Sequence, residues 1–472
     1  MYSLGAVAGL TDDEKSILDE LFRCWTVKLQ RNILRAQYYD HKNVLKNLGI
    51  AIPPHLACID MALGWPAKSV DVLARRCKFE RFTTPKDGGN DPLDIIPMLN
   101  QNDFTMELPQ AITSTFVHSC TFQTITKGDT SIGEPEVLIN SQSAMFGAGL
   151  WDFRRRRLRA AFSVTNSDEC GRVTEWLMFL PGVTIRGRWD RHWEIERYAH
   201  TLDRLPVEVL PYQPRLDRPF GRSRITRSVM GLTDSALRTL MRMEIGAEFY
   251  SSPQRWIMGA DETMFTNPDG TQQSQWQALM GRIWAAPAIE DDGSTLPQVG
   301  QFNASSPTPH TEQLRSLAAM FASETSLPLS ELGIVHDNPS SAEAIEAAER
   351  ALIIEAKFAM DCFTPRLVRA IQTALQIREG WDEMPPEVER LSVRWSAPEN
   401  PVQSAAADAF SKVLGAMPEL AKSPVAMEKV LDWDESTIQR AMEDMRRAKE
   451  EAPKPPVNAV DPAPPVVTPD EA

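Results

Sequence analysis

The sequence has few cysteines and few histidines for a chain of its length. Its 472 residues include six cysteines, and no two have the Cys-x-x-Cys spacing of a zinc or redox site. We expect reduced, buried thiols of a cytosolic protein. Of the seven histidines, His192 and His200 are the closest pair. We interpret them as surface or capping imidazoles, so the sequence predicts no metal site.

Sequence motifs of catalysis and cofactor binding are also missing. The chain has no GxxxxGK[ST] phosphate loop, no HExxH and no GxSxG, which argues against an ATP-driven motor, a zinc protease and a serine hydrolase. FGAGLW (146–151) lacks a third glycine and is typical of a bend in a strand. DGGND (87–91) lacks the terminal glutamate of a calcium loop and predicts a turn. We therefore expect neither an enzyme nor a bound cofactor.

Long apolar runs are absent too. None reaches the roughly 20 residues that cross a bilayer, and MYSLGAVAGLTDDEK at the start is not a secretory signal. We expect a protein that is made and kept in the cytoplasm, or is released only on lysis, with no membrane partner. The net charge of −14 argues against binding nucleic acid over the whole surface.

One basic cluster stands out, RRRRLR at 154–159. Arg154, Arg155, Arg156 and Arg157 could contact a DNA backbone. The pattern is more typical of a hairpin with one solvated face, or of one that pairs with an acidic neighbouring subunit. We favour the structural interpretation and keep the other open.

Helical and strand patterns follow each other along the chain. Thr11 and Glu14 form a capping box before an apolar stripe that predicts a helix of about seven turns. A second helix is expected at 66–78, and a less regular one at 92–118, where Pro97 and Pro109 interrupt. Short segments rich in β-branched and aromatic residues between 120 and 200 predict an antiparallel sheet, and 206–221 is expected to be an extended connector. The fold class is α+β, predominantly helical.

Two helices that flank a small insert form the most informative arrangement. The helices are expected at 231–250, capped by Thr233 or Asp234, and at 310–325, with the insert at 251–306. Paired helices of this kind hold a small head away from the body, which suits contact with a partner. In the insert, Trp256, Trp276 and Trp284 predict a local core or, alternatively, anchors of a partner interface. On the first helix, the pattern predicts surface pairs or contacts between subunits for Arg238, Arg242, Glu244 and Glu248.

An acidic loop precedes the longest helical pattern. Five acidic residues and no Lys or Arg lie between Ser326 and Glu349, and Ser340 with Glu343 has capping-box spacing. The helix that follows is expected to reach about Ile377, kinked or split by Pro365. A strand ending at Trp395 and a helical region at 401–450 come next. The proline-rich tail from Ala452 is expected to be disordered.

Four separated strings resemble the portal proteins of long-tailed bacteriophages, particularly those that infect actinobacteria. They are YYDHKNVLKNLGIAIPP (38–54), AEFYSSPQRWIMGA (247–260), VGQFNASSPTPHTEQLRSLAAMFASETSLPLSELGI (299–334) and NPSSAEAIEAAE (338–349). The likeness runs from about residue 11 to 450 in the family's order. The proline-rich tail is an extension that it does not cover.

The resemblance implies a portal fold that assembles as a ring of identical subunits, typically twelve, at one capsid vertex of the virion. It implies the following regions: wing 1–230, first stem helix 231–250, clip 251–306, second stem helix 307–325, channel loop 326–341, long wing helix and return strand 342–395, helical crown 396–450 and tail 451–472. Double-stranded DNA would pass through the channel in packaging and ejection. The partners implied are the large terminase, head-completion or adaptor proteins, and the major capsid or scaffolding protein, with assembly in the host cytoplasm.

In this arrangement the acidic loop would face DNA. The candidate channel residues are Gly333, Ile334, Val335, His336, Asp337, Asn338, Pro339, Ser340, Ser341 and Glu343. Repeated negative charge around a ring would keep the phosphate backbone from adhering. The same acids also suit the positive end of a helix dipole, which is an equally strong structural interpretation. An alternative from another class is a cytosolic helical scaffold or adaptor that binds partners through the 251–306 insert.

Overall fold

The computed structural model describes most of the body of the chain. The described residues are 4, 7–45, 61–84, 91, 93–250, 255–258, 298–301, 306–334, 342–399, 403–418, 427, 431, 433 and 435–451. The predicted DGGND turn, except Asp91, and the proline-rich tail lie outside them. Within these ranges, no helix combines the length and the apolar character needed to cross a membrane.

The first helix begins where its capping box predicts. In α1 (Asp12–Tyr39) the Thr11 amide donates to Glu14 Oε2 at 2.8 Å, and the Glu14 amide donates to Thr11 Oγ1 at 3.4 Å. Its apolar stripe, which includes Leu18, Leu21 and Trp25, is buried against one face of a sheet. The predicted capping box and stripe are confirmed.

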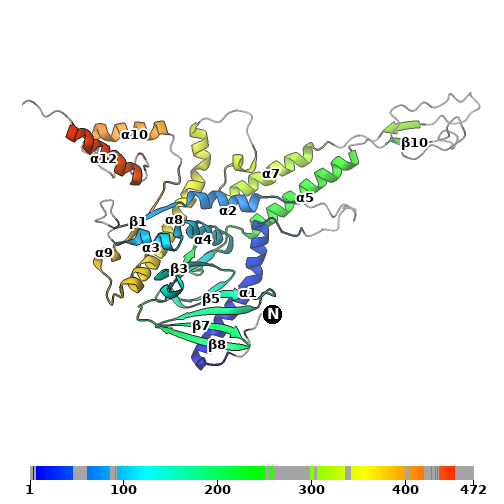
Figure 1. Cartoon of the computed structure of the whole chain (residues 1–472). Helices are drawn as coiled ribbons and strands as arrows, with labels where there is room; N and C mark the ends of the chain where they lie inside the picture. The colour runs from blue at the N-terminus through cyan, green and yellow to red at the C-terminus, as the bar shows by residue number, and fades with distance from the viewer. Residues whose placement is uncertain are drawn as a thin grey trace, which may run out of the picture.

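The sheet under α1 is a five-stranded antiparallel meander (Figure 1). Its strands in order are β4 (Gly147–Asp152), β5 (Arg157–Ser167), β6 (Val173–Leu180), β7 (Val183–Asp190) and β8 (His192–Ala199). The FGAGLW segment is strand, as predicted. Glycine is needed at Gly149 because an added Cβ would lie 2.8 Å from the Leu158 side chain.

A second, three-stranded sheet packs on the helices of the body. Its order is β3 (Val137–Ser143), β2 (Cys120–Lys127) and β9 (Val207–Pro211), with a short 3-10 turn η2 (Thr130–Ile132) between β2 and β3. The prediction that 206–221 is only a connector is wrong for its first part. Every residue of β9 is buried, because the strand pairs with β2 and packs on the long helix α8 (Ala342–Glu379).

Three shorter helices surround the second sheet. They are α2 (Trp65–Arg76), α3 (Ile95–Gln101) and α4 (Phe104–His118). The prolines do not break the 92–118 region, contrary to the prediction, and Pro109 lies inside α4. The chain instead turns at Asp103, whose φ of 48° is left-handed and incompatible with a continuous helix.

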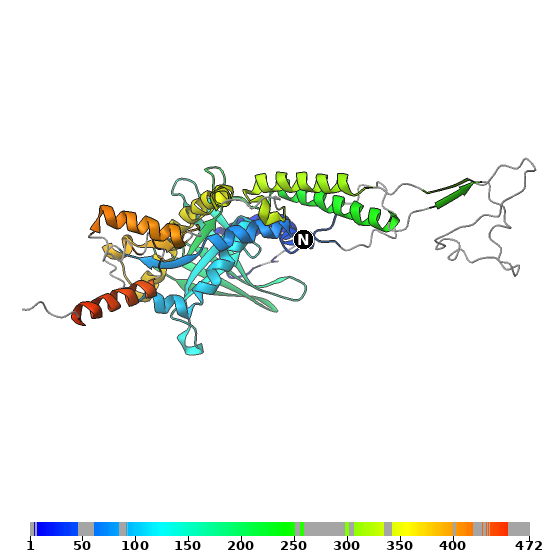
Figure 2. The same ribbon diagram turned by 90° about the horizontal axis from the view of Figure 1, so that it is seen from above.

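A helical stalk projects from the body. Helices α5 (Arg227–Tyr250) and α7 (Thr308–Thr325) lie side by side, and at their far end is the antiparallel ribbon of β10 (Arg255–Met258) and β11 (Gln298–Gln301) (Figures 1 and 2). The nested stalk is as predicted, but its first helix begins earlier than expected. Thr226 caps it, since its Oγ1 accepts from the Val229 amide at 3.2 Å. Thr233 lies within the helix, where its hydroxyl donates to the Val229 carbonyl.

The longest helix passes through the main core. Helix α8 (Ala342–Glu379) is one element with Pro365 inside it, so of the predicted kink or split the split does not occur. After the single turn of α9 (Pro386–Glu389), β12 (Ser392–Trp395) pairs with β1 (Phe79–Thr83). Helices α10 (Gln403–Ala416) and α12 (Glu435–Glu451) lie at the opposite end of the molecule from the ribbon (Figure 1).

The described cysteines are free thiols, and two of them are deeply buried. Cys77 and Cys120 are buried, and burial raises the pKa of the Cys77 thiol to about 12 and that of Cys120 to about 11. The prediction of buried thiols is wrong for Cys170, which is exposed in the turn between β5 and β6.

A glycine in the five-stranded sheet provides a test of the packing. Gly187 lies opposite Trp176, and an added Cβ would come within 2.2 Å of the indole. We expect Gly187→Ala to lower the free energy of unfolding by about 1–3 kcal/mol, because the fully buried indole would have to move. Denaturant unfolding measures this.

The matched control is Gly231→Ala on helix α5, where nothing lies within 4 Å of the new methyl group. That variant should be unchanged or more stable by about 0.5–1 kcal/mol, because alanine favours a helix interior. Equal losses in the two variants would contradict the close packing of Gly187.

Candidate functional site: the stalk and the ends of the acidic loop

The stalk has one face packed and another in solvent. Helix α5 buries Ala236 and Leu237, and α7 buries Ala318 and Phe321 in the main core. Of the predicted stem residues, Arg242 and Glu244 are exposed. Arg238 is half-buried and donates to the Ser235 hydroxyl at 2.9 Å within the same helix. The side chain of Glu248 lies outside the described residues.

A hydrogen bond to α5 ties the stalk to helix α1. The Tyr38 hydroxyl donates to the Asp234 carboxylate, 2.9 Å from either oxygen. Asp234 was predicted as one of two possible caps, and that prediction is wrong because the helix extends back to Arg227. Its carboxylate instead holds the C-terminal end of α1 against the stalk.

A buried arginine fixes the base of the stalk. The Arg224 side chain is only 3% exposed, and its Nη1 lies 2.6 Å from Glu355 Oε1 on α8. Its Nε donates to the Ser69 carbonyl at 2.6 Å, and its other terminal nitrogen donates to the Thr325 carbonyl. Arg224 therefore bonds to α2, to the last residue of α7 and to α8 at once.

Tyr212 also belongs to this network. The Tyr212 hydroxyl donates to Glu355 and accepts from Arg224 Nη1 at 3.1 Å. Burial raises the pKa of the Tyr212 phenol above its usual value, so the hydroxyl stays protonated. Burial opposes the charge of Arg224, but Tyr212 and Glu355 outweigh it and raise its pKa. A buried ion pair that is also hydrogen-bonded is costly to break, because moving either side chain would leave the other charge buried without a partner. The contact therefore holds the helices in one arrangement.

The start of the predicted channel loop is packed against the body. The 3-10 turn η4 (Leu329–Leu332) follows α7, and Gly333 ends it with a left-handed φ of 79°. Leu327 is buried in the main core, and Ile334 packs against that core. Leu327, η4 and Ile334 therefore lie against the body, and the prediction that 326–341 is a channel loop stays a prediction. The candidates at 335–341 and the side chain of Glu343 lie outside the described residues.

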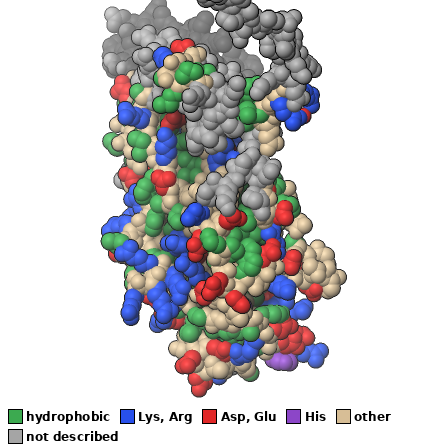
Figure 3. All heavy atoms as spheres, turned by 90° about the vertical axis from the view of Figure 1, so that its left-hand side faces the viewer, with side chains coloured by type: hydrophobic (Ala, Val, Ile, Leu, Met, Phe, Trp, Pro, Cys, Tyr) green, Lys and Arg blue, Asp and Glu red, His purple; other side chains and the backbone are tan. Residues whose placement is uncertain are grey.

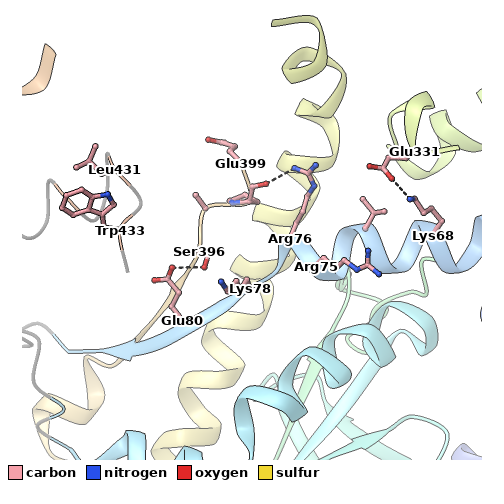
Figure 4. Close-up of a pocket in the computed structure, with 13 residues that line it drawn as sticks. Lys68, Arg75, Arg76, Lys78, Glu80, Glu331, Ser396, Glu399, Leu431 and Trp433 are labelled. Atoms are coloured by element: carbon pink, nitrogen blue, oxygen red, sulfur yellow. Dashed lines mark hydrogen bonds and ion pairs between the residues drawn. The ribbon is translucent and has the colours of Figure 1, made fainter. Parts of the chain in front are cut away.

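Helix α2 binds both ends of the acidic segment. Lys68 Nζ lies 2.7 Å from Glu331 on η4, and Arg76 Nη2 lies 2.9 Å from Glu349 on α8. Arg76 Nη1 also donates to the Pro398 carbonyl at 2.9 Å, and Figure 4 shows Arg76 reaching toward the segment after β12. Two of the five acids in the segment are thus paired within the subunit.

Beside these ion pairs lies a cleft of about 770 Å³ (Figure 4). Its lining includes Arg75 and Lys78 on one side and Leu431 and Trp433 on the other. Glu80 in the same cleft pairs with Arg394 at 2.5 Å. No group of three or more His, Cys, Asp or Glu side chains placed to hold a metal ion is found in the described part of the chain.

The remaining sequence candidates are placed as follows. Trp256 lies on β10 at the end of the stalk, whereas Trp276 and Trp284 are outside the described residues. A hairpin is present at 154–159 as predicted: Arg154, Arg155 and Arg156 lie in the turn between β4 and β5, and Arg157 begins β5. Contact of these arginines with a DNA backbone or with a neighbouring subunit stays a prediction. His192 and His200 belong to no group of three or more potential metal ligands among the described residues.

The sequence analysis missed Arg224 and Glu355. Arg224 lies in a polar stretch that looks like a connector, and no local pattern marks it. Glu355 left a weak signal, a lone carboxylate within the apolar run ALIIEAKF of a helix. A charge on a face otherwise buried indicates a partner from elsewhere in the fold.

Comparisons with known proteins agree over nearly the whole chain. The model of the family described as "Phage portal protein, SPP1 Gp6-like" matches residues 18–452. The portal protein of Mycobacterium phage L5 is 29% identical over 416 residues, 84% of each chain. That of Mycobacterium phage D29 is 28% identical over 437 residues, 88% of each chain. A chain in the solved neck of an empty GTA particle is similar with a TM-score of 0.46 and 14% identity, over 75% of this chain and 86% of that one.

Removing one partner of the buried pair tests the joint at the stalk base. We expect Arg224→Met to cost about 3–5 kcal/mol of unfolding free energy, because Glu355 would stay buried without its counter-ion. The double variant Arg224→Met with Glu355→Met should be more stable than Arg224→Met alone. Denaturant unfolding of the wild type, of Arg224→Met, of Glu355→Met and of the double variant measures the coupling.

Arg315→Met on the exposed side of α7 is the matched control, with an expected change within about 0.5 kcal/mol. Strictly additive losses in the double variant would show that Arg224 and Glu355 act independently.

Proposed function

The chain belongs to the SPP1 Gp6-like family of phage portal proteins, and we propose that twelve copies close into a ring at one capsid vertex. Double-stranded DNA passes through this ring in packaging and in ejection. The ring is also the docking site for the large terminase and for the head-tail connector proteins. The observation that carries the proposal is the family match, which spans residues 18–452 and so includes the body, the stalk and the C-terminal helices.

The parts of the subunit have distinct tasks in this ring. Residues 1–230 form the wing, 231–250 and 307–325 the stem, 251–306 the clip, and 326–341 the channel loop. The long helix with its return strand, 342–395, completes the wing, and 396–450 is the crown. Support comes from the stalk, whose two helices carry the β10–β11 ribbon away from the body (Figure 2).

The clip at the end of the stalk meets the partners. Trp256 lies on the ribbon there, and Trp276 and Trp284 belong to the same insert. Aromatic side chains are favoured anchors of protein interfaces. The terminase binds this end during packaging, and the head-completion proteins replace it afterwards. The wing meets the major capsid or scaffolding protein.

The stem sets the register between neighbouring subunits. Arg242 and Glu244 are exposed on α5, and opposite charges on adjacent stems form pairs between subunits. Arg238 and Glu248 lie on the same helix within two turns of them. A single exposed pair contributes little, but a ring repeats it at every interface.

The channel loop keeps DNA from adhering. Lys68 and Arg76 neutralise Glu331 and Glu349, so the acids left to face DNA are Asp337, Glu343 and Glu346. Their repetition around the ring repels the phosphate backbone at close range. The ion pairs of α2 with Glu331 and Glu349 hold the two described ends of the segment against the body.

The assembly state tests the ring directly. Twelve copies of a 52.9 kDa chain have a mass of more than half a megadalton, and negative-stain images should show closed rings. The alternative, a cytosolic helical scaffold or adaptor that binds partners through 251–306, is disfavoured by the family match. It would be a monomer or a small oligomer, so a native mass in that range would refute the ring.

The acidic loop is tested by a packaging assay. We expect Asp337→Asn with Glu343→Gln to slow DNA filling several-fold while the melting temperature changes little, because the channel wall would repel DNA less. The matched control, Asp382→Asn with Glu383→Gln, removes the same charge from exposed positions after α8 and should fill normally. Normal filling with a lower melting temperature in the loop variant would leave these acids only a helix-capping role.

A further inference from the structure

The proposed portal ring assigns no role to a cluster of arginines on the body. We call it the arginine surface. It combines the turn after β4 with residues before β9 and on the second half of α8: Arg154, Arg155, Arg156, Arg157, Arg204, Arg366 and Arg369. Lys and Arg side chains are prominent on the body in the face shown in Figure 3.

The tip of this surface is a rigid turn. Asp152 Oδ1 accepts from the Arg154 amide at 2.9 Å and from the Arg155 amide at 3.0 Å. Arg156 closes the turn with a left-handed φ of 53°. The turn's own carboxylate is engaged by these two amides and lies 4.0 Å from Arg155 Nε, so one acid faces four arginines, and the side chains of residues 153–156 are exposed.

The arginines behind the tip share too few carboxylates. Arg366 Nη1 lies 3.5 Å from Glu208, a buried residue, and the charges of Arg204 and Arg369 act on the same carboxylate. Arg157 donates to the Asp203 carbonyl at 3.3 Å, which is a neutral acceptor. The surface therefore carries surplus positive charge in a chain whose net charge is −14.

Aromatic rings alternate with these guanidinium groups. The Arg366 guanidinium carbon lies 5.3 Å from the centre of the Trp151 ring, which fixes its position. Phe153 at the tip is 64% exposed. A protein interface would need a larger apolar core than this single ring. Guanidinium groups instead bind phosphates with two hydrogen bonds each, and a protruding turn can reach a duplex backbone.

We propose that the arginine surface binds the phosphate backbone of double-stranded DNA. The proposal rests on the ring function, which brings DNA to this protein. Under this proposal each subunit affects DNA in two ways, by repulsion at the acidic loop and by attraction at the arginine surface. The acidic loop repels the moving duplex, whereas the arginine surface on the outside of the fold retains it through its charges, without reading base sequence.

The test is duplex binding by the full-length protein and by a turn variant. The variant carries Arg154→Ser, Arg155→Ser and Arg156→Asn, since asparagine tolerates the left-handed φ of the third position. Fluorescence anisotropy of a labelled 20-base-pair duplex is measured between about 50 and 200 mM salt. We expect the variant to bind about tenfold more weakly at the lowest salt, with a slope of log K against log salt that is smaller by about 2.

The matched control is Arg215→Ser with Arg218→Ser. These arginines are equally exposed, but both pair with Asp217, so duplex binding should not change. Wild-type protein that does not bind the duplex, or a turn variant that binds like wild type, would overturn the proposal.

Native mass is measured on the same samples. A turn variant that loses the ring while it keeps duplex binding would identify the surface as a contact between subunits, which also overturns the proposal. Wild-type protein that binds through the turn but forms no ring would refute the ring function and leave the arginine surface as a DNA-binding site.

Discussion

The buried contact between Arg224 and Glu355 is the joint on which the rest of the architecture depends. Arg224 touches the three helices that meet at the base of the stalk, through Ser69, Thr325 and Glu355. A buried charge is costly unless every hydrogen-bonding position is filled, so few arrangements of these helices are tolerated. Such a buried ion pair adds little to the net free energy of unfolding, but it favours one arrangement of the helices over others. For a long projection, geometry is what matters, because a small rotation at the base displaces the far end.

Further polar contacts attach the stalk and the neighbouring acidic segment to the body. Tyr38 binds Asp234 on α5, and α2 holds Glu331 and Glu349 at the two ends of the acidic segment. The apolar core then packs α7 and α8 around these points. Polar contacts set the positions of the helices, and burial of Phe321, Phe363 and their neighbours stabilises the result. A portal protein that must hold its partners and the DNA on one axis needs this kind of stiffness.

The proposed contacts with DNA involve two regions of opposite charge in this chain. The net charge is −14, yet part of the negative charge near the proposed channel is cancelled by Lys68 and Arg76, which leaves repulsion to a short segment. On the body, positive side chains outnumber negative ones at the arginine surface. Net charge alone argued only against binding nucleic acid over the whole surface, so local repulsion and local binding are both compatible with it.

The sequence by itself determined the local elements and their order. Thr11 with Glu14 predicted the start of α1, and short segments rich in β-branched and aromatic residues predicted the strands. A helix pair around an insert predicted the stalk. These signals depend only on neighbours within a few residues. It did not reveal β9 as a buried strand, the start of α5 at Arg227, or the pairing of Arg224 with Glu355. Those features depend on contacts between residues far apart in the chain. Only the tertiary structure brings such residues together, and it decides which charges are neutralised and which remain exposed to a partner.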